Sequence, residues 1–172
     1  FLRRRAAAFK AYYEHMPFRM EQKPDGPDQK LYRNYAFGDL VEFNVLDTRQ
    51  YRSDQACNDG FNVVDCRKRF AEDRTILGED QKSWLLDNLE SSSATWDVLA
   101  NQLPIARMDF QVELFGETDE QEGYRMDQWD GYVPDQRAVF EAFEEHVENP
   151  IVVTGDIHRH WANDLVTFDE DS

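Results

Sequence analysis

The chain has 172 residues, a length that suits a single domain with a buried core. Its 35 acidic and 19 basic residues give a formal net charge of −16, so the surface repels phosphate backbones and anionic lipids. We therefore expect no nucleic-acid-binding surface. No apolar run approaches the ~20 residues that a membrane-spanning helix needs. The acidity fits ordinary solubility or adaptation to high salt, and both interpretations stay open.

The first part of the chain predicts a helix and then a β-hairpin. Apolar residues recur every three or four positions over residues 2–16, and Pro17 ends this pattern. Residues 31–37 and 40–46 are rich in aromatic and β-branched side chains, which favours two strands. The Gly-Asp pair at 38–39 predicts a two-residue turn between them.

A polar loop over residues 53–74 contains both cysteines, Cys57 and Cys66. The loop is long for a compact domain, and long loops are usually functional or disordered. A secreted protein would tend to join the two thiols, whereas a cytosolic protein would keep them reduced.

The rest of the chain alternates helices and strands, which is the pattern of an α/β protein. We expect, in chain order, a helix, a strand, a lid-like excursion, a helix and two strands, at residues 77–89, 96–103, 104–130, 134–147, 151–154 and 161–168. The first of these helices is expected to bury Trp84, Leu85 and Leu89. The strand at 151–154 is expected to be buried in a parallel sheet.

Two polar residues follow this last buried strand. The apolar run stops at Gly155, and Asp156 and His158 come next. Ligand-binding groups in open α/β sheets collect beyond the carboxyl ends of the strands, and a carboxylate with an imidazole suits a transition metal. The alternative is an ordinary polar turn.

Five segments in order resemble the alkaline phosphatase D (PhoD) family of calcineurin-like metallophosphoesterases. They are DTRQYRSDQ, GEDQKSWL, NQLP, DQWDGY, and TGDIH with a tryptophan close behind it, which begin at residues 47, 78, 101, 127 and 154. The resemblance covers residues 1–168, nearly the whole chain. It implies the C-terminal part of an α/β fold, the family's four-layer αββα sandwich. Residues 1–172 would then be part of a catalytic domain whose N-terminal half is absent.

The resemblance also implies roles for four residues. Asp156 and His158 align with the family's closing Gly-His-x-His motif and are the expected metal ligands, with Asp156 at the first histidine's position. Arg49 is expected to bind phosphate oxygens through its guanidinium group. Asn101 is expected to contact a cation or the phosphate. Structural roles are the alternatives: an ion pair for Arg49, a turn or cap for Asn101 and Asp156, and an ordinary core or surface position for His158.

Neighbouring residues receive lesser roles. We expect Asp47 to anchor Arg49 or Arg52 rather than to bind metal. Residues 129–132 would form a pocket wall or part of the core. His160 would support a ligand or simply be exposed.

The implied function is metal-dependent hydrolysis of phosphate esters, with iron and calcium as cofactors. The family's upstream ligand motifs are not found in this sequence, so we expect the chain to be inactive alone. A noncatalytic module that kept the fold, or another calcineurin-like hydrolase, are the alternatives. The resemblance further implies an extracellular, periplasmic or cell-surface location, with a signal peptide lying upstream. It also favours a disulfide between the two cysteines. The sequence indicates no oligomeric state.

Overall fold

A computed structural model of the chain describes residues 1–60, 63–108 and 123–166. Its contacts divide the chain into two units, Phe1–Arg33 and Asn34–Ser172. None of the helices in the described part of the chain is long and apolar enough to cross a membrane.

The first unit is built on helix α1 (Leu2–His15), which confirms the predicted helix and ends before Pro17. A short 3-10 helix, η1 (Met20–Gln22), follows it. The ring of Phe18 lies between these two helices in sequence and packs against the ring of Tyr12, with centroids 4.8 Å apart. No residue of α1 is buried, so its apolar positions remain accessible on this unit.

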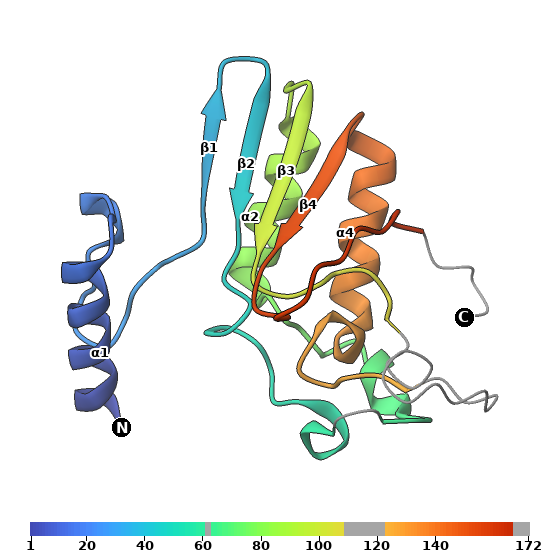
Figure 1. The fold of residues 1–172 in the computed structure, drawn as a ribbon, viewed down its shortest axis with the longest axis horizontal. Helices are drawn as coiled ribbons and strands as arrows, with labels where there is room; N and C mark the ends of the chain where they lie inside the picture. The colour runs from blue at the N-terminus through green and yellow to red at the C-terminus, as the bar shows by residue number, and fades with distance from the viewer. Residues whose placement is uncertain (61–62, 109–122, 167–172) are drawn as a thin grey trace. The chain divides into compact units, whose positions relative to one another are not determined.

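The second unit holds a four-stranded sheet in the order β1-β2-β3-β4. The strands are β1 (Arg33–Phe37), β2 (Val41–Val45), β3 (Trp96–Asn101) and β4 (Pro150–Thr154). Strands β2, β3 and β4 are parallel, and β1 runs opposite to β2 (Figure 1). The carboxyl ends of the three parallel strands therefore meet at one edge of the sheet, the lower edge in Figure 1.

The turn between β1 and β2 has the predicted pair Gly38 and Asp39 as its two central residues. The second strand begins at Val41, one residue later than expected. Gly38 has a φ of +61°, a conformation that glycine adopts without steric cost. The Leu40 amide donates to the carbonyl of Phe37 at 3.3 Å, which closes the turn around Gly38 and Asp39 as predicted.

Two helices, α2 (Glu79–Ser91) and α4 (Val133–His146), cover one face of the sheet and confirm the two predicted helices (Figure 1). Pro134 lies in the first turn of α4, where its missing N–H costs nothing. Leu85 and Leu89 of α2 are buried as expected, but Trp84 is only partly buried. Their core partners on the sheet and in nearby loops are Leu46, Ile76, Leu99, Leu103 and Ile105.

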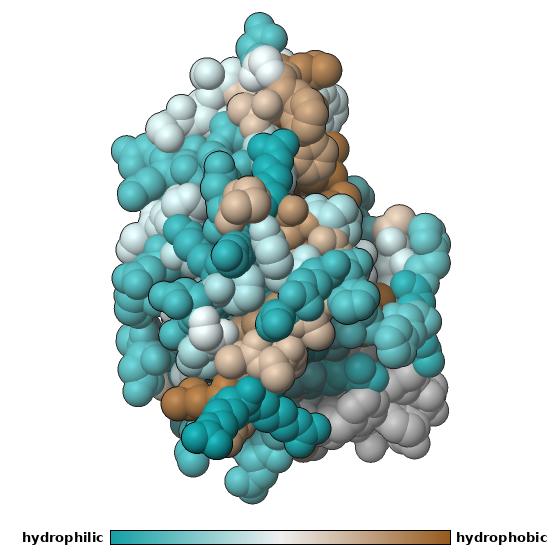
Figure 2. All heavy atoms as spheres, turned by 90° about the vertical axis from the view of Figure 1, so that its left-hand side faces the viewer, coloured by the Kyte–Doolittle hydropathy of each residue, from teal (hydrophilic) through white to brown (hydrophobic). Residues whose placement is uncertain are grey.

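The opposite face of the sheet is also apolar, and its β4 positions are exposed. Ile151 and Val153 remain 39% and 46% exposed, so the prediction that this strand is buried is wrong for the described chain. The reason is geometric: alternate residues of a strand face opposite sides, and these two face away from α2 and α4 while Val152 packs against the core. Figure 2 shows hydrophobic residues on this side of the surface, with the largest group in the upper part of the view.

The described parts of the segment expected to form a lid, residues 104–108 and 123–130, contribute buried side chains to the core. Ile105, Met126 and Trp129 are 2%, 0% and 0% exposed, and the last begins the short 3-10 helix η4 (Trp129–Gly131). Residues 109–122 of the predicted lid lie outside the described residues.

The C-terminal strand predicted at 161–168 is not found. Residues 161–166 form neither helix nor strand, and residues 167–168 lie outside the described part. The last described strand is therefore β4.

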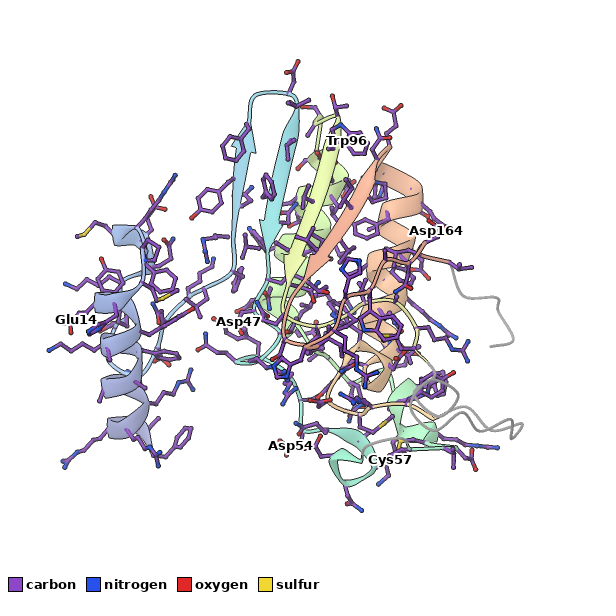
Figure 3. The ribbon with its side chains drawn as sticks, in the orientation of Figure 1. Glu14, Asp47, Asp54, Cys57, Trp96 and Asp164 are labelled. Atoms are coloured by element: carbon purple, nitrogen blue, oxygen red, sulfur yellow. A yellow bond between two sulfur atoms is a disulfide. The ribbon has the colours of Figure 1, made fainter. Side chains whose placement is uncertain are left out.

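The polar loop after β2 is closed by a disulfide between Cys57 and Cys66, as the family resemblance implied. Each cysteine belongs to or borders a 3-10 helix, η2 (Ala56–Asp59) and η3 (Arg67–Phe70). The bond shows as a yellow link beside the Cys57 label in Figure 3. The loop is thus a cross-linked structure rather than a free excursion.

Candidate active site at the strand ends

Asp47 organises the loop that follows β2. Its Oδ1 accepts the backbone amides of Arg49 and Gln50, both at 3.0 Å, and its Oδ2 accepts the side-chain amide of Gln50. This is the local turn that aspartate favours. Asp47 is 4% exposed and lies at the carboxyl end of β2 (Figure 3). The expectation that Asp47 anchors Arg49 is met through the backbone of Arg49, not through its guanidinium group.

Two glutamine side chains hold the same loop from either side. Gln81 of α2 donates to the carbonyl of Asp47 at 2.9 Å and accepts its amide at 2.7 Å. Gln102, just after β3, accepts the amide of Thr48 and donates to the carbonyl of Leu46, both at 2.8 Å. Each side-chain amide therefore pairs with backbone groups as a neighbouring strand would. Sequence reasoning assigned no role to either glutamine.

The loop places Arg49 against a residue 107 positions away in the sequence. Its Nη2 donates to Oδ2 of Asp156 at 2.5 Å, and its Nη1 lies 3.8 Å from Oδ2 of Asp127. The three side chains are 38%, 46% and 40% exposed, so solvent reaches all of them. The structure thus brings two of the four predicted site residues into contact and adds Asp127, which the sequence did not single out.

Asp156 and His158 have an unusual backbone. Both have a φ of +58°, in the left-handed region that residues other than glycine rarely occupy. Left-handed residues of this kind carry strain of about 1–3 kcal/mol and cluster at functional sites. Both side chains are exposed and line a cavity of about 1100 Å³ between α4, β4 and residues 155–166.

The donors present fit part of a cation site. The carboxylate of Asp156 already binds a cationic group, the guanidinium of Arg49. His158 supplies a second donor two residues along the same turn. Within the described residues, no group of three or more His, Cys, Asp or Glu side chains is placed to hold a metal ion. A carboxylate and an imidazole are ligand types that suit a transition metal, and their role as metal ligands stays a prediction.

Asn101, the fourth predicted residue, is held at the end of β3. Its Oδ1 accepts the backbone amide of Leu103 at 3.0 Å and the indole N–H of Trp129 at 3.1 Å. Its Nδ2 is buried and has no hydrogen-bond partner among the described residues. The oxygen is therefore engaged by protein donors, and the expected contact of Asn101 with a cation or the phosphate stays a prediction.

The DQWDGY segment, residues 127–132, braces this region as part of the core. Trp129 and Tyr132 are 0% exposed, which favours the core interpretation over a pocket wall. The hydroxyl of Tyr132 donates to the carbonyl of Ser53 at 2.8 Å, and Arg52 donates to the carbonyl of Asp127 at 3.0 Å. These contacts tie the segment to the loop after β2.

A buried carboxyl group lies within this segment. Asp130 is 2% exposed, and its Oδ2 accepts the Met108 amide at 3.3 Å. Burial raises the pKa of Asp130 to about 7, and the Met108 amide and the nearby cation Arg69 only partly oppose that rise. Burial in turn lowers the pKa of Arg69.

Comparison with known proteins identifies the family. The sequence model of the PhoD-like phosphatases matches residues 1–172. The chain belongs to the PhoD-like phosphatase family. It is 46% identical to alkaline phosphatase D of Bacillus subtilis (strain 168) over 174 residues, which is all of this chain and 29% of that protein. The predicted resemblance is therefore confirmed.

A solved structure described as the structure of PhoD supports the same assignment. It is 46% identical in sequence and superposes with a TM-score of 0.82 over 91% of this chain. The chain covers 29% of that protein, less than a third of its length. The predicted α/β fold of part of a PhoD-like protein is thereby confirmed.

Proposed function

We propose that this chain supplies part of the active site of a metal-dependent phosphoric ester hydrolase of the alkaline phosphatase D type. The observation that carries the proposal is the contact between Arg49 and Asp156 at the carboxyl ends of β2 and β4. Residues far apart in sequence meet at the edge where α/β sheets place their ligands. Membership of the PhoD-like family supports the reaction class.

The four predicted site residues have two kinds of proposed role, metal binding and phosphate binding. Asp156 and His158 provide a carboxylate and an imidazole to iron or calcium, with further ligands supplied from beyond this chain. Such cations supply positive charge that offsets the charge of a phosphate group. Arg49 binds phosphate oxygens with its planar guanidinium, and Asn101 donates from Nδ2.

The disulfide supports a location outside the reducing cytosol. Disulfides persist in the periplasm, at the cell surface and in secreted proteins. The bond between Cys57 and Cys66 closes the loop that lies next to the site. We therefore propose an extracellular, periplasmic or cell-surface location. Thiol alkylation of protein from its native source, with and without reductant, checks it: two thiols reactive before reduction would contradict the proposal.

The test of function uses the full-length gene product. Metal content is measured together with turnover of p-nitrophenyl phosphate and its bis ester, for wild type, His158→Ala and, as a matched control, His146→Ala. His146 lies at the exposed end of α4, outside every motif. We expect iron and calcium in the wild type, and loss of both metal and rate by orders of magnitude in H158A only.

The opposite outcome is equally informative. If wild type carries metal and hydrolyses the esters while H158A does the same, the site assignment is wrong. If the wild type neither binds metal nor hydrolyses either ester, the chain belongs to a noncatalytic relative that kept the fold.

A further inference from the structure

Arg49 lies between two carboxylates that belong to different parts of the chain. One guanidinium nitrogen contacts Asp156, after β4, at 2.5 Å, and the other lies 3.8 Å from Asp127, before η4. All three side chains are partly exposed, so both ion pairs are solvent-accessible and individually weak. Weak, accessible ion pairs can exchange partners at little cost.

The backbone of Arg49 is far more constrained than its side chain. Its amide is bound by Asp47, whose own backbone is paired with Gln81 of α2. Asp127 is likewise fixed, because Arg52 binds its carbonyl at 3.0 Å. A change of partner therefore requires only rotation of the Arg49 side chain.

The same oxygen of Asp156 that binds Arg49 belongs to the carboxylate assigned to a metal ion under the proposed function. A guanidinium at 2.5 Å from one carboxylate oxygen and a divalent cation bound to the same carboxylate repel each other, so each weakens the binding of the other. Resting on the proposed function, we infer that Arg49 is an internal counter-ion of the site, which occupies Asp156 until a divalent cation displaces it.

Displacement changes what Arg49 can do. Once it leaves Asp156, its remaining carboxylate partner among the described contacts is Asp127, so one edge of the guanidinium becomes available to phosphate oxygens. Cation binding therefore precedes and promotes phosphate binding. By linkage, cation and phosphate bind with positive coupling that depends on Arg49.

The experiment measures binding rather than turnover. Mn²⁺, which accepts carboxylate and imidazole ligands, is titrated into the metal-stripped full-length gene product and followed by electron paramagnetic resonance. Arg49→Gln removes the competing charge, so we expect it to bind Mn²⁺ about two- to fivefold more tightly than wild type. The same variant, loaded with Mn²⁺, is expected to bind inorganic phosphate about tenfold more weakly.

Two control variants make the outcome decisive. Arg49→Lys keeps the charge and is expected to bind Mn²⁺ within about twofold of wild type. His158→Ala is expected to weaken Mn²⁺ binding, which shows that the titration reports this site. If H158A weakens binding but R49Q fails to strengthen it, the counter-ion inference is overturned while the proposed function stands. If H158A leaves Mn²⁺ binding unchanged, the metal assignment itself fails, and the inference with it.

Discussion

The buried carboxyl group of Asp130 is expected to make the free energy of unfolding depend on pH. Burial raises its pKa from 3.8 to about 7 in the folded protein, and Oδ1 has no hydrogen-bond partner among the described residues. Asp130→Asn keeps the shape of the side chain and removes its proton equilibrium. The comparison of the two proteins therefore isolates the effect of ionising this one group.

The sign follows from proton linkage. A pKa raised in the folded state means that the folded protein binds the proton more tightly than the unfolded chain does. The resulting stability is complete below about pH 4 and is lost as the pH rises through about 7. With pKa values of 3.8 unfolded and about 7 folded, the wild type loses about 2 to 3 kcal/mol between about pH 5 and pH 8 from this group.

The assay is urea unfolding of the wild type and D130N at several pH values between these limits. Between about pH 5 and pH 8, the free energy of unfolding of D130N should rise by about 2 to 3 kcal/mol relative to that of the wild type. Ile76→Val, a substitution in the same core without a titratable group, should cost about 1 kcal/mol at every pH. A gap between wild type and D130N that stays constant with pH would refute the argument that burial keeps Asp130 protonated.

Three further changes test the packing that supports the site. Asp135→Ala removes a buried carboxylate that accepts three hydrogen bonds from residues 75–77, and should cost about 3 to 5 kcal/mol in urea unfolding; a cost below about 1 kcal/mol would contradict it. Changing Cys57 and Cys66 together to serine opens a loop of sequence separation 9 and should cost about 2 to 3 kcal/mol, with no change on adding reductant. Gly131→Ala places a Cβ 2.3 Å from a backbone carbonyl, so it should lower the thermal midpoint. The loss in the free energy of unfolding at that temperature should be about 1 to 3 kcal/mol. An unchanged midpoint would show that the segment can shift.

Element type and order could be predicted because each element carries a local signal. The period of three to four residues identified α1, α2 and α4, and β-branched runs identified β2, β3 and β4. The position of Pro134 correctly placed the start of α4. Local rules of this kind need no knowledge of the rest of the chain.

The errors arose where packing decides. Residues 104–108 and 123–130 show no period, yet Ile105 and Met126 are buried, because an irregular segment can fill a core without repeating. For β4 the error ran the other way, since an apolar strand was expected to be covered on both faces. Covering depends on partners, and only one face of β4 meets helices in the described residues.

Within the site, sequence motifs named Arg49 and Asp156 separately, but their contact is a product of topology. Parallel strands bring residues 107 positions apart to one edge of the sheet, and local spacing rules do not predict contacts over so large a sequence separation. Gln81 shows the same limit, since it lies inside a helix and looks like a surface residue by composition. Its side chain is buried and hydrogen-bonds to both the amide and the carbonyl of Asp47, which fixes the loop.

The loop after β2 combines a rigid backbone with ion pairs of Arg49 that can exchange partners. The backbone of the loop after β2 is held by a partly buried hydrogen bond to Asp47 and a buried one from Gln81, each worth about 1 kcal/mol. The ion pairs of Arg49, in contrast, are exposed and worth about 1 kcal/mol at most. The side chain of Arg49 can therefore move toward a ligand while the backbone of the loop after β2 stays in place. For that reason the competition between Arg49 and a cation for Asp156 can alter affinity without disturbing the fold.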